Sequence, residues 1–136
     1  MMNVIDTSVV TKWLFRELDS DIAIAILENE QEYFAPDYLR IEFQSTVSKK
    51  IRTGLITIEE GQRRLDDFRK FNFYYKSFEE IEHLSFELSA HYPITFYDAM
   101  FLALAIQQNA YLITFDRRLK RSVIRTELEE LVVIPV

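Results

Sequence analysis

Short apolar runs alternate along the chain with longer stretches in which apolar side chains recur at helical spacing. The short runs predict strands at residues 2–5, 32–35, 110–114 and 131–134, with 73–75 as a candidate fifth. The longer stretches predict helices at residues 9–15, 19–30, 37–53, 57–71, 77–91 and 95–109, followed by a short helix near Arg117. Strands that alternate with helices predict an α/β fold, a three-layer sandwich with a mainly parallel central sheet flanked by helices.

Polar residues mark several boundaries of these elements. The first apolar run stops at Asp6, Thr7 and Ser8, residue types that cap helices and form turns. Gly54 follows the third predicted helix and suits the conformation that commonly ends a helix. The apolar run at 99–106 is too continuous for a surface helix, so we expect this helix to be buried on most sides.

The composition narrows the class of protein. A length of 136 residues predicts one domain spanning 1–136, since a common domain has ~150 residues. With 49% apolar residues, 2 Gly and 3 Pro, the chain is neither disordered nor collagen-like. The absence of Cys excludes disulfides, Cys-containing zinc sites and thiol catalysis.

The same composition argues against a membrane protein. Polar residues interrupt the longest uncharged stretch, 99–115, so no membrane span is expected. The N-terminal sequence MMNVIDTSVV places an Asp where a signal peptide needs apolar residues. We therefore expect a cytoplasmic protein.

Four carboxylates are candidates for a functional site. Ligands of parallel α/β sheets bind outside the carboxyl ends of the strands, and Asp6 and Asp116 each follow a predicted strand. Asp98 lies in the first turn of the helix that precedes the strand at 110–114, which directs it toward the same end of the sheet. Glu42 borders the apolar face of its helix.

Each of these acids also has a structural interpretation. Asp6 and Asp116 could cap the helices that follow them, and Glu42 could be a solvated helix residue. Thr95 and Asp98 fit a capping box. None of the four acids identifies a site when it is taken alone.

The local charge favours a metal site. The net charge is −6, and no Lys or Arg occurs between Lys76 and Arg117. Carboxylates that are brought together without cations repel one another unless they share protons or bind a metal ion. Ligands that are all oxygen suit Mg²⁺ or Mn²⁺ better than zinc. Such ions can activate water and offset the charge that develops at a phosphodiester bond.

Each of the four acids lies in a longer motif. The segments are V-I-D-T-S-V-V-T-K-W (4–13), A-P-D-Y-L-R-I-E-F (35–43), T-F-Y-D-A-M-F-L-A-L-A (95–105) and L-I-T-F-D-R-R-L (112–119). These segments resemble the conserved blocks of PIN-domain ribonucleases, particularly the VapC toxins of toxin–antitoxin pairs. The resemblance covers nearly the whole chain, and the order and spacing of the four acids agree with the family. One departure is Ser45, where relatives often carry Asn. This departure leaves open which side chains support Glu42.

This resemblance implies a PIN fold and an Mg²⁺- or Mn²⁺-dependent endoribonuclease that cleaves RNA phosphodiester bonds with metal-activated water. It implies that four acids bind the metal: Asp6, Glu42, Asp98 and Asp116. Ser8 and Thr114 match hydroxyl positions that support these carboxylates in the family, although both could equally form caps and strand-end hydrogen bonds. The implied partners are an RNA substrate, a VapB-type antitoxin whose C-terminal segment covers the active groove, and a second copy in a homodimer.

Two basic clusters are candidates for RNA contacts. One directly follows Asp116, and the other lies farther along the helix that carries Glu42. Their members are Arg117, Arg118, Lys120 and Arg121, and Lys49 and Lys50. Either cluster could instead be a solvated helix face. One or two tyrosines could stack on bases, but the sequence does not select them.

Two other functions fit part of this pattern. A catalytically idle PIN-type module that binds RNA or protein would have no reason to keep all four acids. A receiver-like phosphoacceptor domain also gathers acids and Mg²⁺ at strand ends. That domain needs an acidic pair after the first strand and a Lys after a late strand, whereas Asp6 stands alone and Arg117 follows Asp116. The nuclease is therefore the leading hypothesis.

Overall fold

The computed structural model describes residues 2–136. Its strands are β1 (Asn3–Ile5), β2 (Glu32–Pro36), β3 (Asn72–Lys76), β4 (Leu112–Ile113) and β5 (Val132–Val133). Its α-helices are α1 (Thr7–Leu14), α2 (Ser20–Asn29), α3 (Tyr38–Arg52), α4 (Ile58–Phe68), α5 (Phe78–His91), α6 (Phe96–Gln108) and α7 (Arg117–Ser122). A turn of 3₁₀ helix at Glu129–Leu131 precedes β5. Every predicted strand and helix is present, including the candidate strand at 73–75.

The five strands form one parallel sheet in the order β3-β2-β1-β4-β5. From β1 the chain winds outward through β2 to β3, and it then returns to the other side of β1 to form β4 and β5. In the pairing of β1 with β4, Val4 lies opposite Leu112 and Ile5 opposite Ile113. The winding therefore reverses between β1 and β4. Such a reversal point is where open α/β sheets bind ligands.

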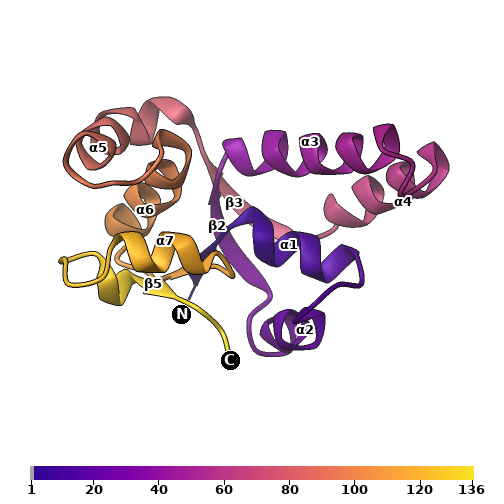
Figure 1. The fold of residues 1–136 in the computed structure, drawn as a ribbon, viewed down its shortest axis with the longest axis horizontal. Helices are drawn as coiled ribbons and strands as arrows, with labels where there is room; N and C mark the ends of the chain where they lie inside the picture. The colour runs from indigo at the N-terminus through magenta and orange to yellow at the C-terminus, as the bar shows by residue number, and fades with distance from the viewer. Residues whose placement is uncertain (1) are drawn as a thin grey trace.

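Helices cover the sheet on both sides, which confirms the predicted α/β sandwich. Figure 1 shows α1 to α4, which connect β1 to β3, on one side and α5 and α6 on the other. Trp13 holds α1 against α2, because its indole N–H donates to the carbonyl of Ala23 at 2.8 Å. Its ring also packs against Tyr33 and Phe71, at centroid distances of 5.1 and 4.8 Å.

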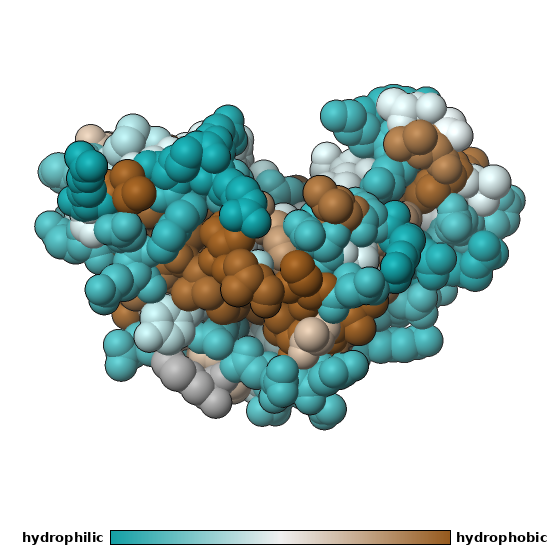
Figure 2. All heavy atoms as spheres, turned by 60° about the horizontal axis from the view of Figure 1, so that its bottom comes forward, coloured by the Kyte–Doolittle hydropathy of each residue, from teal (hydrophilic) through white to brown (hydrophobic). Residues whose placement is uncertain are grey.

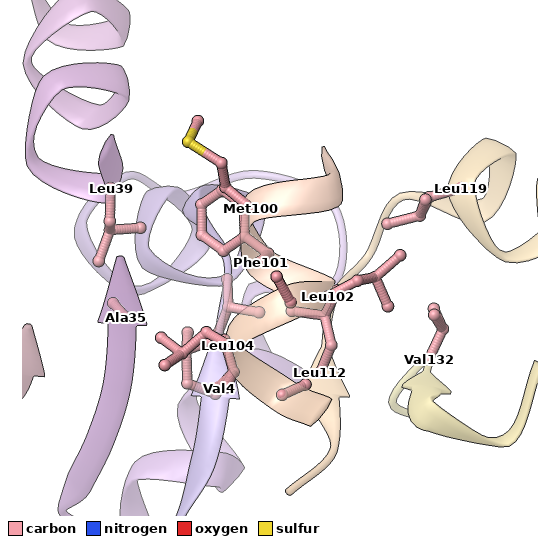
Figure 3. Close-up of a cluster of buried hydrophobic side chains, with 14 of the residues drawn as sticks. Val4, Ala35, Leu39, Met100, Phe101, Leu102, Leu104, Leu112, Leu119 and Val132 are labelled. Atoms are coloured by element: carbon pink, nitrogen blue, oxygen red, sulfur yellow. The ribbon is translucent and has the colours of Figure 1, made fainter. Parts of the chain in front are cut away.

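Helix α6 forms the centre of the hydrophobic core. All residues from 99 to 105 are buried, which confirms the predicted burial, while Ile106 is partly exposed. Figure 3 shows Leu102 and Leu104 of α6 beside Val4 of β1 and Leu112 of β4. Burial of one such side chain contributes about 1.5–3 kcal/mol. The core therefore fixes the start of α6 relative to the ends of β1 and β4.

Three boundaries differ from the prediction by more than one residue, and the others differ by at most one. Helix α1 begins at Thr7, earlier than predicted, because Asp6 accepts a hydrogen bond from the backbone N–H of Ser8 and caps the helix. Helix α4 ends earlier than predicted because β3 takes up the chain from Asn72. Strand β4 begins at Leu112 and has only 2 residues, although Tyr111 still accepts a backbone hydrogen bond from Val4 of β1 and Thr114 still donates one to Val133 of β5.

Hydrophobic side chains also reach the surface. Figure 2 shows a band of hydrophobic residues across the middle of the face in view. The same figure shows a hollow at the upper edge, between the two ends of the molecule. A shallow pocket of about 460 Å³ lies between α2 and the C-terminal residues Pro135 and Val136, and none of the four candidate acids lines it. Within residues 2–136, no helix has the length and apolar character needed to cross a membrane.

Candidate active site

Asp6 lies at the end of β1, where it caps α1 and contacts the segment after β4. Its Oδ1 accepts hydrogen bonds from the backbone N–H of Ser8 at 3.0 Å and from the Ser8 hydroxyl at 2.5 Å. Its Oδ2 accepts a hydrogen bond from the hydroxyl of Thr114. The Ser8 hydroxyl also accepts one from the backbone N–H of Phe115 at 2.9 Å. The carboxylate and the two hydroxyls therefore join the two strands at the reversal point.

The environment of Asp6 disfavours its charged form. Desolvation on burial raises the pKa of Asp6 from 3.8 to about 6, although the hydrogen bonds from Ser8 and Thr114 lower it. The negative charge of Glu42 raises the pKa of Asp6 as well. A carboxylate held in this way is stabilised by any cation that comes close to it.

Asp116 lies two residues after Thr114 and caps α7. Its Oδ1 accepts a hydrogen bond from the backbone N–H of Leu119 at 3.1 Å. Its own backbone N–H donates to the Thr114 hydroxyl at 3.0 Å. The capping interpretation of Asp6 and Asp116 is therefore confirmed, and both caps lie at the reversal point of the sheet.

Asp98 enters the same region from the start of α6. The N-cap residue Thr95 accepts a hydrogen bond from the backbone N–H of Asp98 at 3.1 Å. Burial raises the pKa of Asp98, and the side chain of Thr95 lowers it. The negative charges of Asp116 and Glu42 also raise this pKa, while the positive charge of Arg118 lowers it. Asp98 therefore lies within electrostatic range of two other candidate acids.

Glu42 reaches the site from α3. Its Oε1 accepts a hydrogen bond from the hydroxyl of Thr7, and its Oε2 accepts one from the hydroxyl of Tyr38 at 3.4 Å. Its hydrogen bond from Thr7 places Glu42 beside the residue that follows Asp6, and its negative charge raises the pKa of both Asp6 and Asp98. Four elements of the fold thus bring the four acids to one end of the sheet.

The chemistry of this donor set fits a hard divalent cation. The side chains offer carboxylate and hydroxyl oxygens, which Mg²⁺ and Mn²⁺ prefer. In the described part of the chain, no ion pair to Lys, Arg or His neutralises any of the four acids. Across residues 2–136, however, no three Asp, Glu, His or Cys side chains stand close enough together to hold one ion. An ion shared by three of the acids therefore requires their side chains to move.

The predicted basic clusters contain side chains in different environments. Four of the six are exposed: Arg117, Arg118, Arg121 and Lys49. The ammonium of Lys50 lies over the ring of Phe15, at 4.8 Å from its centroid. Lys120 points toward β5 and donates to the backbone carbonyls of Glu129 at 2.5 Å and Val132 at 2.7 Å. Its ammonium holds α7 to the segment that forms β5.

We expect replacement of Lys120 by Met to lower the free energy of unfolding by about 2–3 kcal/mol, since hydrogen bonds from a charged donor contribute about that much. Urea denaturation measures this loss. The matched control is Arg121→Met, because Arg121 is exposed on the same helix. Surface substitutions of this kind change stability by about 0.5 kcal/mol or less. Equal stability of the two variants would show that the Lys120 contacts contribute nothing.

Two side chains that contact the acids were not candidates in the sequence analysis: Thr7 and Tyr38. Tyr38 precedes Glu42 by one helical turn, so helical spacing alone places the two side chains on one face. The contact of Thr7 with Glu42 joins α1 to α3 and spans 35 positions of the chain. No local pattern in the sequence indicates that contact.

The chain is similar in sequence and fold to several known proteins. The chain is 29% identical over 121 residues to Ribonuclease VapC3 of Pyrobaculum aerophilum, which covers 88% of this chain and 92% of that protein. Its fold is similar to a chain of a toxin-antitoxin complex from Klebsiella pneumoniae, with a TM-score of 0.70, 20% identity and 98% of each chain covered. It is also similar to a chain of VapBC2 from Rickettsia felis bound to a DNA fragment from their promoter, with a TM-score of 0.66, 19% identity and 100% of each chain covered.

The family comparison covers most of the chain. Residues 4–123 match the PIN domain family, from β1 through α7. All four candidate acids and the two supporting hydroxyls lie within the matched residues. The chain therefore belongs to the PIN domain family.

Proposed function

We propose that this protein is a metal-dependent endoribonuclease that acts as the toxin of a toxin–antitoxin pair. The observation that supports this most is the placement of Asp6 and Asp98 at the reversal point of the sheet, where the negative charge of Glu42 raises the pKa of both. Burial and this repulsion make the charged forms of Asp6 and Asp98 costly without a cation. The similarity to Ribonuclease VapC3 supports RNA as the class of substrate.

The residues that would hold the ion are Asp6, Glu42, Asp98 and Asp116. Their oxygen ligands favour Mg²⁺ or Mn²⁺. When bound, such an ion supplies activated water and offsets the negative charge that develops during hydrolysis of a phosphodiester bond.

Neighbouring side chains of this chain would orient the acids. Ser8 and Thr114 donate hydrogen bonds to Asp6 and so fix the plane of its carboxylate. Such outer contacts keep a ligand in the orientation that the ion needs. Thr7 and Tyr38 contact the two oxygens of Glu42, and these contacts must loosen if Glu42 moves toward a shared ion.

The exposed basic side chains are suited to the RNA backbone. Arg117 and Arg118 are exposed in the first turn of α7, directly after Asp116, and the positive charge of Arg118 lowers the pKa of Asp98. We assign these two residues, with Arg121, Lys49 and Lys50, to phosphates on either side of the cleaved bond. Lys120 makes no part of this surface, because its ammonium is bound to backbone carbonyls.

The proposal includes protein partners. A VapB-type antitoxin would inhibit the nuclease, and the similar fold in a toxin-antitoxin complex from Klebsiella pneumoniae supports a partner of this kind. We further propose that the protein forms a homodimer and acts in the cytoplasm.

The test is RNA cleavage by the purified protein. We expect single-stranded RNA to be cleaved with Mg²⁺ or Mn²⁺, cleavage to stop in EDTA, and activity to return when excess metal is added back. Gel electrophoresis of end-labelled RNA measures the products. Equal cleavage in EDTA would remove the metal-dependent function. Binding of RNA without cleavage at any metal concentration would favour the catalytically idle binding module.

A further inference from the structure

Two tyrosines form an aromatic stack beside the acidic site. Tyr38 is the first residue of α3, and Tyr97 is the second residue of α6. Their ring centroids lie 5.0 Å apart, and the ring planes differ by 25°. Tyr97 is 55% exposed, so a large part of its ring is open to solvent although Tyr38 covers one side.

The stack is fixed to the core and to the acids. Phe101 meets the ring of Tyr38 edge-on, at a centroid distance of 6.3 Å and an interplanar angle of 73°. The hydroxyl of Tyr38 donates to Oε2 of Glu42 at 3.4 Å, and Tyr97 directly precedes Asp98. A ligand group that lies on Tyr97 is therefore next to any phosphate held at the acids.

An apolar groove continues from the stack, between the start of α3 and helices α5 and α6. It has a volume of about 460 Å³. Besides the two tyrosines, its walls include Ile41, Phe78, Phe96 and Met100. A surface of this kind accepts the flat apolar face of a ring, and it carries no basic side chain that would hold a phosphate.

Basic side chains occur near the site but not in the stack itself. Arg118 is exposed two positions after Asp116, and its positive charge lowers the pKa of Asp98, the residue that follows Tyr97. Arg40 lies over the ring of Tyr75, at 4.7 Å from its centroid, and forms an ion pair with Asp37 of the groove wall at 2.7 Å. An exposed aromatic ring near basic side chains is an arrangement that proteins use to bind single-stranded nucleic acid.

We propose that Tyr97, supported by Tyr38, stacks on the nucleobase next to the cleaved phosphate. This inference rests on the proposed ribonuclease function and adds a determinant of substrate choice to it. Bases of a duplex are stacked on one another, so only a base in a single strand, loop or bulge can turn onto Tyr97. The stack of Tyr97 on Tyr38 thus selects unpaired RNA. It tolerates several base types, because every base has an aromatic face.

The first measurement compares RNA cleavage by Tyr97→Leu and Tyr97→Phe with that of the wild type on a short single-stranded RNA. We expect Tyr97→Leu to lower kcat/KM about tenfold, mainly through KM, in line with the loss of one base stack. Tyr97→Phe keeps the ring and should stay within about twofold of the wild type. The matched control is Tyr111→Leu, because Tyr111 is also half-exposed but lies at the start of β4, at the other end of the sheet.

The second measurement uses RNAs that carry one abasic nucleotide at successive positions around the cleaved bond. The loss caused by Tyr97→Leu should disappear on the one RNA that lacks the stacked base. A purely structural defect would lower kcat/KM equally on every RNA and would overturn the proposal, as would wild-type kinetics for Tyr97→Leu. Loss of self-association in light scattering with unchanged kinetics would assign this surface to a second copy and would also overturn it.

Binding of the same RNAs in EDTA separates this proposal from the proposed function. Fluorescence anisotropy should show weaker binding by Tyr97→Leu, with the same dependence on one base. If the wild type binds in this way but cleaves nothing, base stacking on Tyr97 is supported and the nuclease proposal is wrong. If RNA is cleaved but neither binding nor cleavage depends on Tyr97, the nuclease proposal is supported and base stacking on Tyr97 is wrong. Absence of both RNA binding in EDTA and RNA cleavage with Mg²⁺ or Mn²⁺ by the wild type would overturn both.

Discussion

Replacement of Asp6 by Asn is expected to lower kcat/KM for RNA cleavage by more than about 100-fold, since loss of a group that only orients a metal ligand already costs about 10–100-fold. The amide keeps the size of the side chain and an oxygen that can cap α1, but it removes the negative charge at the reversal point. Asp98→Asn should have an effect of the same order. Cleavage of end-labelled RNA at saturating Mg²⁺ measures both losses.

The matched control for these variants is Asp66→Asn. Asp66 is an exposed acid on α4, where it pairs with Arg69 at 3.0 Å, and it lies outside the candidate site. Its amide variant should cleave RNA as the wild type does. Cleavage by Asp6→Asn and Asp98→Asn at the rate of this control would refute the assignment of the acids. A loss confined to low Mg²⁺ would instead indicate weaker metal binding, which a metal titration measures directly.

The pH dependence of stability should reveal the raised pKa of Asp6 in EDTA. Burial raises this pKa from 3.8 to about 6, so the folded state holds the proton more tightly than the unfolded state. The resulting stabilisation is fully present below pH 3.8 and is lost as the pH rises through about 6. The loss is up to about 3 kcal/mol, because one pKa unit corresponds to about 1.4 kcal/mol.

Other carboxylates titrate in the same range, so the informative quantity is the difference between the wild type and Asp6→Asn. The amide does not titrate. Relative to the wild type, the free energy of unfolding of the variant should therefore rise by about 2–3 kcal/mol between pH 4 and pH 7. Denaturation at a series of pH values in EDTA measures this difference. If the free energies of unfolding of the two proteins change with pH in parallel, burial does not raise the pKa of Asp6. Added Mg²⁺ should reduce the advantage of the variant, because the cation stabilises the charged carboxylate of the wild type.

The order of elements and the buried helix could be predicted from local pattern. Strands and helices have different periods of apolar residues, and the run at 99–106 had too many apolar residues for a surface helix. The end of helix α3 could also be predicted from Gly54, which follows the helix and adopts a φ of 78°. The length of β4 could not be predicted, because pairing with β1 and β5 sets it, and both strands lie far from β4 or follow it in the sequence.

The acids of the site were candidates because two of them follow strands, and the support of the carboxylates by Ser8 and Thr114 was predicted by the family resemblance rather than by any local pattern. The hydrogen bond from Thr114 to Asp6 joins residues 108 positions apart. The sequence also did not indicate which tyrosine could stack on a base. Tyr97 is distinguished by its stack with Tyr38, which joins α3 and α6. Alternative interpretations also proved compatible rather than exclusive: Asp6 and Asp116 cap helices and carry charge at the same sheet end.

The contact between Asp6 and Thr114 also has a consequence for synthesis of the protein. Asp6 leaves the ribosome long before Thr114, because 108 positions separate the two residues. Strand β4, which precedes Thr114, cannot join β1 until the chain between them has been made. A nascent chain therefore has no assembled acidic site until synthesis has passed Asp116, and the proposed nuclease activity cannot arise earlier.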